Sequence, residues 1–117
     1  MKPSLLEQKC NILRNLIIES VFHAGSGHPG GSLSAVELMV VLYEKFLKFD
    51  PETPSWSERD YVILSKGHAA PLMYGILSMY GYISKEELAT LRKLGSRLQG
   101  HPDATKLPGI EVSTGSL

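Results

Sequence analysis

The sequence predicts an α/β fold, a parallel sheet flanked by helices, in which these 117 residues are mostly helical with about one recognisable strand. Helical periodicity recurs in several segments, and a short apolar run at residues 61–64 combines β-branched and aromatic side chains between Asp60 and Gly67. A lone parallel strand needs neighbours, because its backbone edges must be paired or covered. We therefore expect residues 1–117 to be an incomplete part of one larger domain.

The first expected helix covers residues 5–24. Apolar residues recur there at spacings of three and four: Leu6, Cys10, Leu13, Ile17 and Val21. Further apolar side chains widen this face, and such a helix needs more than one neighbour. Four glycines and one proline within residues 25–31 predict its end. We expect His23 to act as a C-terminal cap without a chemical role.

Three further helices are expected. The capping-box pairs Ser34–Glu37 and Ser84–Glu87 predict helices that run to Phe46 and to about Gly95. Between them, residues 50–60 are typical of an exposed loop. A helix is also expected at residues 69–80, directly after the strand, with Pro71 in its first turn. Residues 96–117 show no sustained period, so we expect irregular structure there.

Composition excludes several classes of protein. Twelve Lys and Arg balance twelve Asp and Glu, so no overall charge favours nucleic acid or an anionic membrane. A single cysteine, Cys10, cannot form an intramolecular disulfide and indicates a buried thiol in a reducing compartment. Apolar runs such as residues 16–18 are too short to span a bilayer, and the N-terminus lacks a signal-peptide pattern. We expect a cytoplasmic protein without nucleic-acid or membrane partners.

Three of the four histidines directly follow a glycine: His28, His68 and His101. Glycine lets the backbone of a loop approach a ligand closely. Imidazole titrates near neutrality and can donate or accept a proton, so converging histidines suit proton transfer at a hydroxyl or carbonyl. Solvent-exposed turn histidines are the ordinary alternative. A zinc site is another, although no two of them have helical ligand spacing and no acidic residue completes a metal motif.

Residues 61–73 predict a strand, a glycine-containing turn and a helix start. This arrangement directs free N–H groups toward a site where a phosphate or another polar ligand can bind. The glycine spacing of the Walker loop and of the dinucleotide fingerprint is missing. Lys66 is either a partner for such an anion or an ordinary solvated lysine.

Four blocks of the sequence resemble the transketolases. They are SGHPGGSLS at 26–34, RDYVILSKGHA at 59–69, QGHP at 99–102 and GIEVSTGSL at 109–117. The blocks occur in the family's order and cover nearly the whole chain. The resemblance implies the N-terminal part of a thiamine-diphosphate-binding domain. It also implies an enzyme that transfers a two-carbon ketol unit from a ketose phosphate to an aldose phosphate.

The resemblance also implies roles for individual residues. By this comparison His28 lies at the substrate and assists proton transfer, His68 reaches the cofactor diphosphate and the substrate, and His101 binds the hydroxyls of the donor sugar. The backbone of Gly115, Ser116 and Leu117 contacts the cofactor. Ser116 departs from the family pattern, because many members have proline there.

The family's magnesium-binding Gly-Asp-Gly block and its activating glutamate are not found in residues 1–117. The pattern is more similar to split transketolases, whose halves are separate chains. We therefore expect no metal ligands in this chain, no activity of the chain alone, and a homo- or hetero-oligomer with the remaining domains or a C-terminal subunit. The alternatives are a deoxyxylulose phosphate synthase, or a catalytically silent fragment that only associates with a partner.

Overall fold

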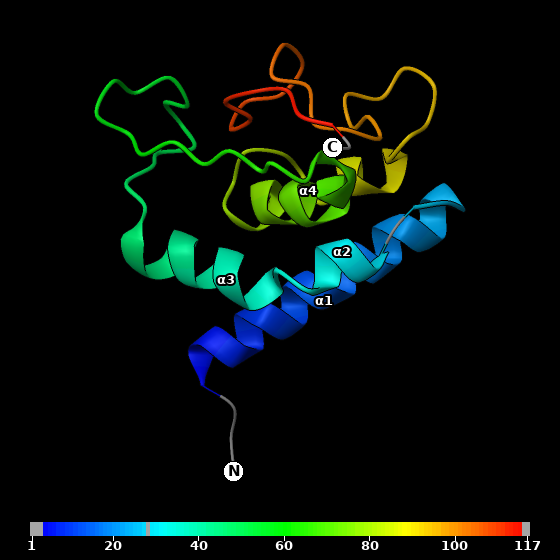
Figure 1. The fold of residues 1–117 in the computed structure, drawn as a ribbon, viewed down its shortest axis with the longest axis horizontal. Helices are drawn as coiled ribbons and strands as arrows, with labels where there is room; N and C mark the ends of the chain where they lie inside the picture. The colour runs from blue at the N-terminus through cyan, green and yellow to red at the C-terminus, as the bar shows by residue number, and fades with distance from the viewer. Residues whose placement is uncertain (1–3, 28, 116–117) are drawn as a thin grey trace.

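The computed structural model describes residues 4–27 and 29–115, and the described part is mostly helical. The helices are α1 (Leu5–Ala24), α2 (Pro29–Leu33), α3 (Val36–Val41) and α4 (Ala70–Met79). A π-helical segment, Leu42–Phe46, extends α3, and short 3₁₀ helices cover Gly67–Ala69 and Glu86–Thr90. Helices α1, α2 and α3 lie on one side of α4, and the irregular segments lie on the other (Figure 1).

Helix α1 has the predicted bounds. The Ser4 hydroxyl accepts a hydrogen bond from the Glu7 N–H (3.2 Å) and begins the helix. Gly25 ends it in the left-handed conformation (φ 70°), and its N–H donates to the carbonyls of Val21 and Phe22. His23 lies in the last turn, but the expectation that it caps the helix is wrong because Gly25 makes the cap.

Helix α4 lies at the centre of the core. Its residues 70–77 are buried, and Pro71 occupies the first turn as predicted. A Cβ at Gly75 would lie 2.7 Å from Leu13 Cδ1, so this glycine permits the close approach of α4 to α1. Helix α1 also packs against α2, α3 and the 3₁₀ helix Glu86–Thr90. The prediction that the helix at 5–24 needs several neighbours is confirmed.

The segment that follows α1 differs from the prediction. Residues 29–33 form the short helix α2 despite their glycines, because a proline fits the first turn without losing a hydrogen bond. The expected capping box at Ser34 and Glu37 is wrong. The hydroxyl of Ser34 donates to the Gly31 carbonyl (3.0 Å), and α3 begins after Ala35 without a side-chain cap.

The second capping box is half formed. The Ser84 hydroxyl accepts a hydrogen bond from the Glu87 N–H (3.2 Å). The Glu87 carboxylate does not return to Ser84 but accepts two hydrogen bonds from one edge of the Arg97 guanidinium, from Nε (2.8 Å) and Nη2 (2.7 Å). The helix that we expected to reach Gly95 therefore ends as a 3₁₀ turn at Thr90.

The predicted strand at residues 61–64 is not formed within the described part of the chain, where these residues join no ladder. Tyr61 and Ile63 are exposed while Val62 and Leu64 pack against the core, so the run alternates as an extended segment does. A strand needs a paired neighbour, and the pairing found among residues 4–27 and 29–115 is one isolated parallel bridge between Lys66 and Gly115. The expected parallel sheet is not seen in these residues.

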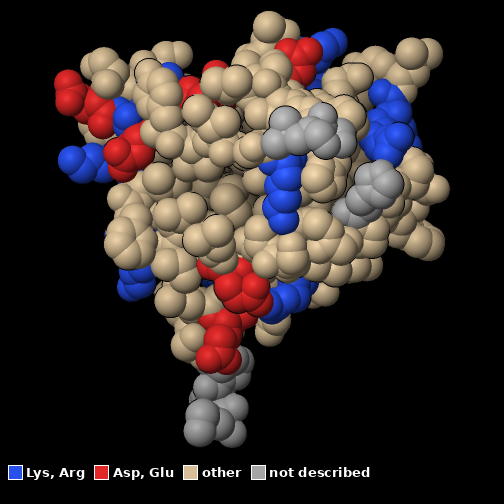
Figure 2. Space-filling model, viewed as in Figure 1, with Lys and Arg blue, Asp and Glu red and all other residues tan. Residues whose placement is uncertain are grey.

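Charge is distributed as the composition suggests. On the face shown in Figure 2, Lys and Arg alternate with Asp and Glu around broad uncharged areas. No described helix combines the length and the apolar character that crossing a membrane requires.

The outer side of α1 exposes large apolar side chains: Leu5 (64%), Ile12 (51%), Ile18 (49%) and Phe22 (79%). Exposed apolar surface of this kind marks an interaction site. We predict that residues 1–117 self-associate or assemble with further domains. Light scattering at micromolar concentration should show an assembly. A monodisperse monomer that unfolds cooperatively would contradict this prediction.

Candidate functional site

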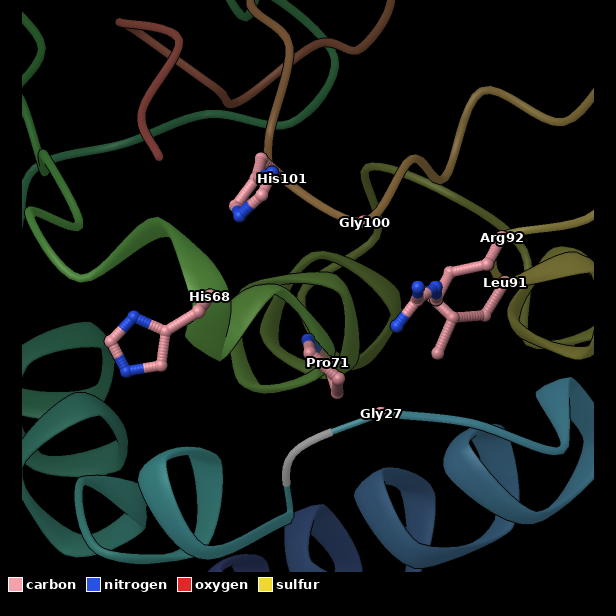
Figure 3. A pocket seen from close by; sticks show the side chains of 7 residues that line it. All are labelled: Gly27, His68, Pro71, Leu91, Arg92, Gly100 and His101. Carbon is pink, nitrogen blue, oxygen red and sulfur yellow. The ribbon is translucent and has the colours of Figure 1, made fainter. Parts of the chain in front are cut away.

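Segments far apart in the sequence meet at a pocket of about 410 Å³ near the start of α4. Its lining residues are Gly27, His68, Pro71, Leu91, Arg92, Gly100 and His101 (Figure 3). Two of the three candidate histidines, His68 and His101, thus line one pocket. His28 lies outside the described residues, as do Ser116 and Leu117, while Gly27 next to His28 lines the pocket.

His101 is exposed on an irregular segment whose backbone is held on both sides. The Tyr74 hydroxyl, on α4, donates to the Gln99 carbonyl (2.5 Å), and the Thr114 N–H donates to the Pro102 carbonyl (3.2 Å). Burial raises the pKa of Tyr74, so its hydroxyl remains a donor at neutral pH. The imidazole of His101 therefore projects from a fixed backbone.

His68 is placed differently from His101. Its ring points away from Pro71 in Figure 3 and lies beside α2, where a Cβ at Gly31 would be 3.5 Å from its Cδ2 and Nε2. The Nδ1 atom of His68 is buried without a hydrogen-bond partner in the described structure. Leaving such an atom unpaired is costly, which indicates a site for a polar ligand.

Gly115, the described member of the expected cofactor-binding trio, crosses Gly67. The Gly67 N–H donates to the Gly115 carbonyl (3.2 Å). A Cβ at Gly67 would lie 2.5 Å from the Thr114 carbonyl carbon and 2.7 Å from Gly115 Cα. Only a residue without a side chain allows this backbone contact. Next to the crossing, the hydroxyl oxygen of Thr114 is also buried without a partner in the described structure.

Lys66 has a role that sequence analysis missed. Its ammonium group donates to the Gly31 carbonyl (2.7 Å) and to the Ser34 hydroxyl (3.1 Å). Lys66 is therefore not an ordinary solvated lysine. It links α2 to the turn before α4, and the buried Ser32 hydroxyl reinforces this link by accepting the Leu72 N–H (3.3 Å).

Arg92 is a second residue of the pocket that sequence analysis missed. Its φ of 61° is the one positive value recorded for a non-glycine residue in the described structure. This conformation costs on the order of 1–2 kcal/mol for a residue with a Cβ. The Arg92 N–H donates to the carbonyl of buried Leu98 (2.8 Å), and buried Leu91 precedes it. The packed leucines hold the strained backbone of Arg92, and no sequence pattern predicts this conformation.

Residues 6–117 match the family model described as "Transketolase, thiamine diphosphate binding domain". The chain belongs to this transketolase family. The resemblance expected from the sequence is confirmed, and the match covers nearly all of the chain.

Similar proteins include the 6-deoxy-6-sulfo-D-fructose transketolase subunit SqwG of Clostridium sp. (strain MSTE9), 43% identical over 112 residues, which span 96% of this chain and 41% of that protein. Transketolase of Treponema pallidum (strain Nichols) is 44% identical over 106 residues, 90% of this chain and 16% of that protein. This transketolase segment therefore spans less than half the length of the relatives named here.

Solved structures agree with the family. Transketolase from Pichia stipitis in complex with sedoheptulose-7-phosphate matches with a TM-score of 0.94 at 39% identity, over 98% of this chain and 17% of that one. Transketolase from Leishmania mexicana matches with a TM-score of 0.93 at 35% identity, over 99% and 18% of the two chains. The arrangement of helices and irregular segments is thus that of the matching part of a transketolase.

The residues present in this transketolase segment fit thiamine diphosphate. His68 Nδ1 and the Thr114 hydroxyl are buried polar atoms without partners in the described structure, in the residues next to Gly67 and Gly115, which cross. An imidazole and a hydroxyl suit the polar groups of a phosphorylated cofactor. Within residues 4–27 and 29–115, no group of three or more His, Cys, Asp or Glu side chains is placed to hold a metal ion.

Proposed function

We propose that this chain supplies part of the cofactor and substrate site of a transketolase, which transfers a two-carbon ketol unit from a ketose phosphate to an aldose phosphate. The observation that carries the proposal is the pocket shared by His68 and His101, in a chain that superimposes on a transketolase solved with sedoheptulose-7-phosphate. Thiamine diphosphate, when bound, supplies the nucleophilic carbon that carries the ketol unit.

His68 and the backbone of Gly115, Ser116 and Leu117 hold the cofactor in this proposal. The unpaired Nδ1 of His68 and the close crossing at Gly67 and Gly115 support it. The ligands of the Mg²⁺ ion come from outside this chain, because the family's magnesium-binding block does not occur in its sequence.

His28 and His101 act on the sugar. His101 is exposed in the pocket, and its imidazole can bind a hydroxyl and hold or move a proton at that oxygen. His28 follows Gly27, which lines the same pocket, and assists proton transfer at the substrate. The sugar is a phosphate ester in the first candidate function. A sulfonated sugar is the second, because SqwG is 43% identical to this chain and is named for such a substrate.

The remainder of the enzyme completes the fold and the site. In this proposal, residues 1–117 are the incomplete N-terminal part of the thiamine-diphosphate-binding domain. The exposed edge of residues 61–64 pairs there with strands of the missing part in a parallel sheet, flanked by helices. The remaining domains, or a C-terminal subunit as in a split enzyme, cover the apolar face of α1 in a homo- or hetero-oligomer. The assembly works in the cytoplasm, in the pentose phosphate pathway.

The test is an assay of residues 1–117 alone and of the completed protein, whose missing parts are restored on the same or a second chain. Both receive thiamine diphosphate, Mg²⁺, fructose 6-phosphate and an aldose phosphate, and the ketose product is measured. We expect turnover from the completed protein and none from residues 1–117 alone. Turnover by residues 1–117 alone would contradict the division of the site.

The same assay, repeated with pyruvate in place of fructose 6-phosphate, separates the alternatives. If residues 1–117 bind the missing parts but the assembly shows no turnover, the chain is a catalytically silent fragment. A product formed from pyruvate and an aldose phosphate would indicate a deoxyxylulose phosphate synthase. The relatives and structures named above are transketolases, which favours ketol transfer.

A further inference from the structure

Arg59 and Glu111 form an ion pair that joins two segments far apart in the sequence. Arg59 Nε donates to Glu111 Oε2 (2.8 Å), and Arg59 Nη2 donates to Glu111 Oε1 (2.9 Å). The two side chains are 16% and 15% exposed, against 38% and 59% in the pair Arg14–Glu37. Exposed ion pairs contribute little to stability, whereas a sheltered pair with two parallel hydrogen bonds also fixes a geometry. The Arg59–Glu111 pair is therefore suited to positioning the segments that it joins.

Arg59 is itself held in place before it reaches its partner. Its Nη1 donates to the Trp56 carbonyl (2.8 Å), and its guanidinium lies over the ring of Tyr61, 4.2 Å from the centroid. The neighbouring Asp60 carboxylate accepts the Lys48 N–H (2.7 Å), and the Asp60 N–H donates to the Lys48 carbonyl (2.7 Å). The guanidinium is thus anchored to the segment that follows the π-helical turn.

Residues 61–66 and 110–115 lie side by side between this ion pair and the parallel bridge from Lys66 to Gly115. Apolar side chains of both segments line one small cavity: Val62, Leu64, Ile110 and Val112. Figure 1 shows the red C-terminal segment ending beside the start of α4. With a connection at each end, neither segment can slide along the other. A slip of one residue would turn the side chains to the opposite face and move Gly115 away from Gly67.

The segment that Glu111 fixes leads directly to the proposed cofactor site. Thr114, whose buried hydroxyl oxygen has no partner in the described structure, and Gly115 follow Glu111 by three and four residues. Neither member of the ion pair lines the pocket of His68 and His101. Any effect of the pair on that site is therefore transmitted through the backbone.

We propose that Arg59 and Glu111 are positioning residues that hold Thr114 and Gly115 against Gly67 in the arrangement that thiamine diphosphate requires. This inference rests on the proposed function, in which Gly115 contacts the cofactor. It adds two residues outside the pocket to those that determine cofactor affinity.

The experiment compares Arg59→Gln, Glu111→Gln and the double variant with wild type in the completed protein. Glutamine keeps nearly the volume of Glu111 and removes its charge and one of its two acceptors. Calorimetric titration with thiamine diphosphate in the presence of Mg²⁺ should give a dissociation constant raised about tenfold to a hundredfold in each single variant, the usual cost of losing a group that orients a ligand contact. The double variant should bind the cofactor no more weakly than the weaker single variant, because both changes break the same interaction.

The matched control is Arg97→Gln, which breaks a second ion pair with two parallel hydrogen bonds. Arg97 Nε and Nη2 donate to Glu87 at 2.8 and 2.7 Å, and both residues lie outside the segments 61–66 and 110–115. Arg97→Gln should lower the melting temperature and leave the dissociation constant of thiamine diphosphate unchanged. An equal rise of that constant in Arg97→Gln and Arg59→Gln would overturn the inference. So would an unchanged constant in Glu111→Gln, or additive losses in the double variant.

Hydrogen exchange without cofactor separates this inference from the proposed function. The Gly67 N–H donates to the Gly115 carbonyl (3.2 Å), and the Thr114 N–H donates to the Pro102 carbonyl (3.2 Å). Mass spectrometry of the peptides around Gly67 and Thr114 should show exchange at least about tenfold faster in Glu111→Gln and unchanged in Arg97→Gln. If wild type neither bound thiamine diphosphate nor transferred a ketol unit, the proposed function would fail, and exchange would still decide whether the ion pair holds the crossing. Equal exchange in wild type and Glu111→Gln would overturn the positioning role.

Discussion

Replacing His101 by alanine in the completed enzyme is expected to lower kcat/KM about 10²- to 10⁴-fold, the usual contribution of a positioned acid–base group. The fold should persist, because the His101 side chain is exposed and its backbone is held by Tyr74 and Thr114 through neighbouring carbonyls. Steady-state kinetics with fructose 6-phosphate, together with circular dichroism, measures both effects. His28→Ala should give a loss of the same size.

His68→Ala should show an additional effect on the cofactor. Its buried, unpaired Nδ1 is proposed to serve thiamine diphosphate, so the dissociation constant of the cofactor should rise as well as kcat/KM fall. Calorimetric titration with thiamine diphosphate separates this effect from the one at His101.

His23 provides the matched control for these histidines. It is exposed at the end of α1, where its ring contacts the edge of Phe22 at a centroid distance of 5.8 Å and does not line the pocket. His23→Ala should change the free energy of unfolding by about 1 kcal/mol or less and leave the kinetics unchanged. A kinetic loss in His23→Ala equal to that in His28→Ala and His101→Ala would contradict the argument from glycine-preceded histidines.

Gly67→Ala is expected to separate the turn before α4 from the C-terminal segment. The new methyl group would lie 2.5 Å from the Thr114 carbonyl carbon, and backbone atoms cannot rotate out of the way as a side chain can. We expect a loss of about 1–3 kcal/mol or more in the free energy of unfolding. Thiamine diphosphate should also bind more weakly, because Gly115 would be displaced.

The control for Gly67→Ala is Gly30→Ala. Gly30 lies in α2, and a Cβ there would meet no atom within 4 Å. This substitution should leave the melting temperature nearly unchanged or raise it, since alanine favours helix over glycine. If Gly67→Ala melted and bound the cofactor as Gly30→Ala does, the glycine crossing would have no role in the site.

The helices that pack on the core could be predicted from local pattern. In α1, apolar spacing, the serine at its start and the glycine at its end all indicate the same bounds, because each acts within a few residues. Helix α4 was predicted to within a residue or two for the same reason. The pairing of glycine with histidine likewise indicated His68 and His101, which line one pocket.

Features that depend on a distant partner were not predicted correctly for the described chain, or were missed. The run at 61–64 has the composition of a strand but lacks a neighbour in the described chain, and Glu87 binds Arg97 rather than completing a capping box. Composition cannot reveal such competition, because it is settled by which groups meet in space.

The sequence by itself determined the family, the main helices and the candidate histidines, since motifs and periodicities are local properties of the chain. Only the tertiary structure decided the contacts of Lys66 with α2, the crossing of Gly67 with Gly115 and the left-handed backbone of Arg92. Each of these depends on segments that lie 6 to 48 residues apart in the sequence, such as Arg92 with Leu98 and Gly67 with Gly115. Such contacts form only when the packed core brings those segments together, and short-range sequence patterns do not predict them.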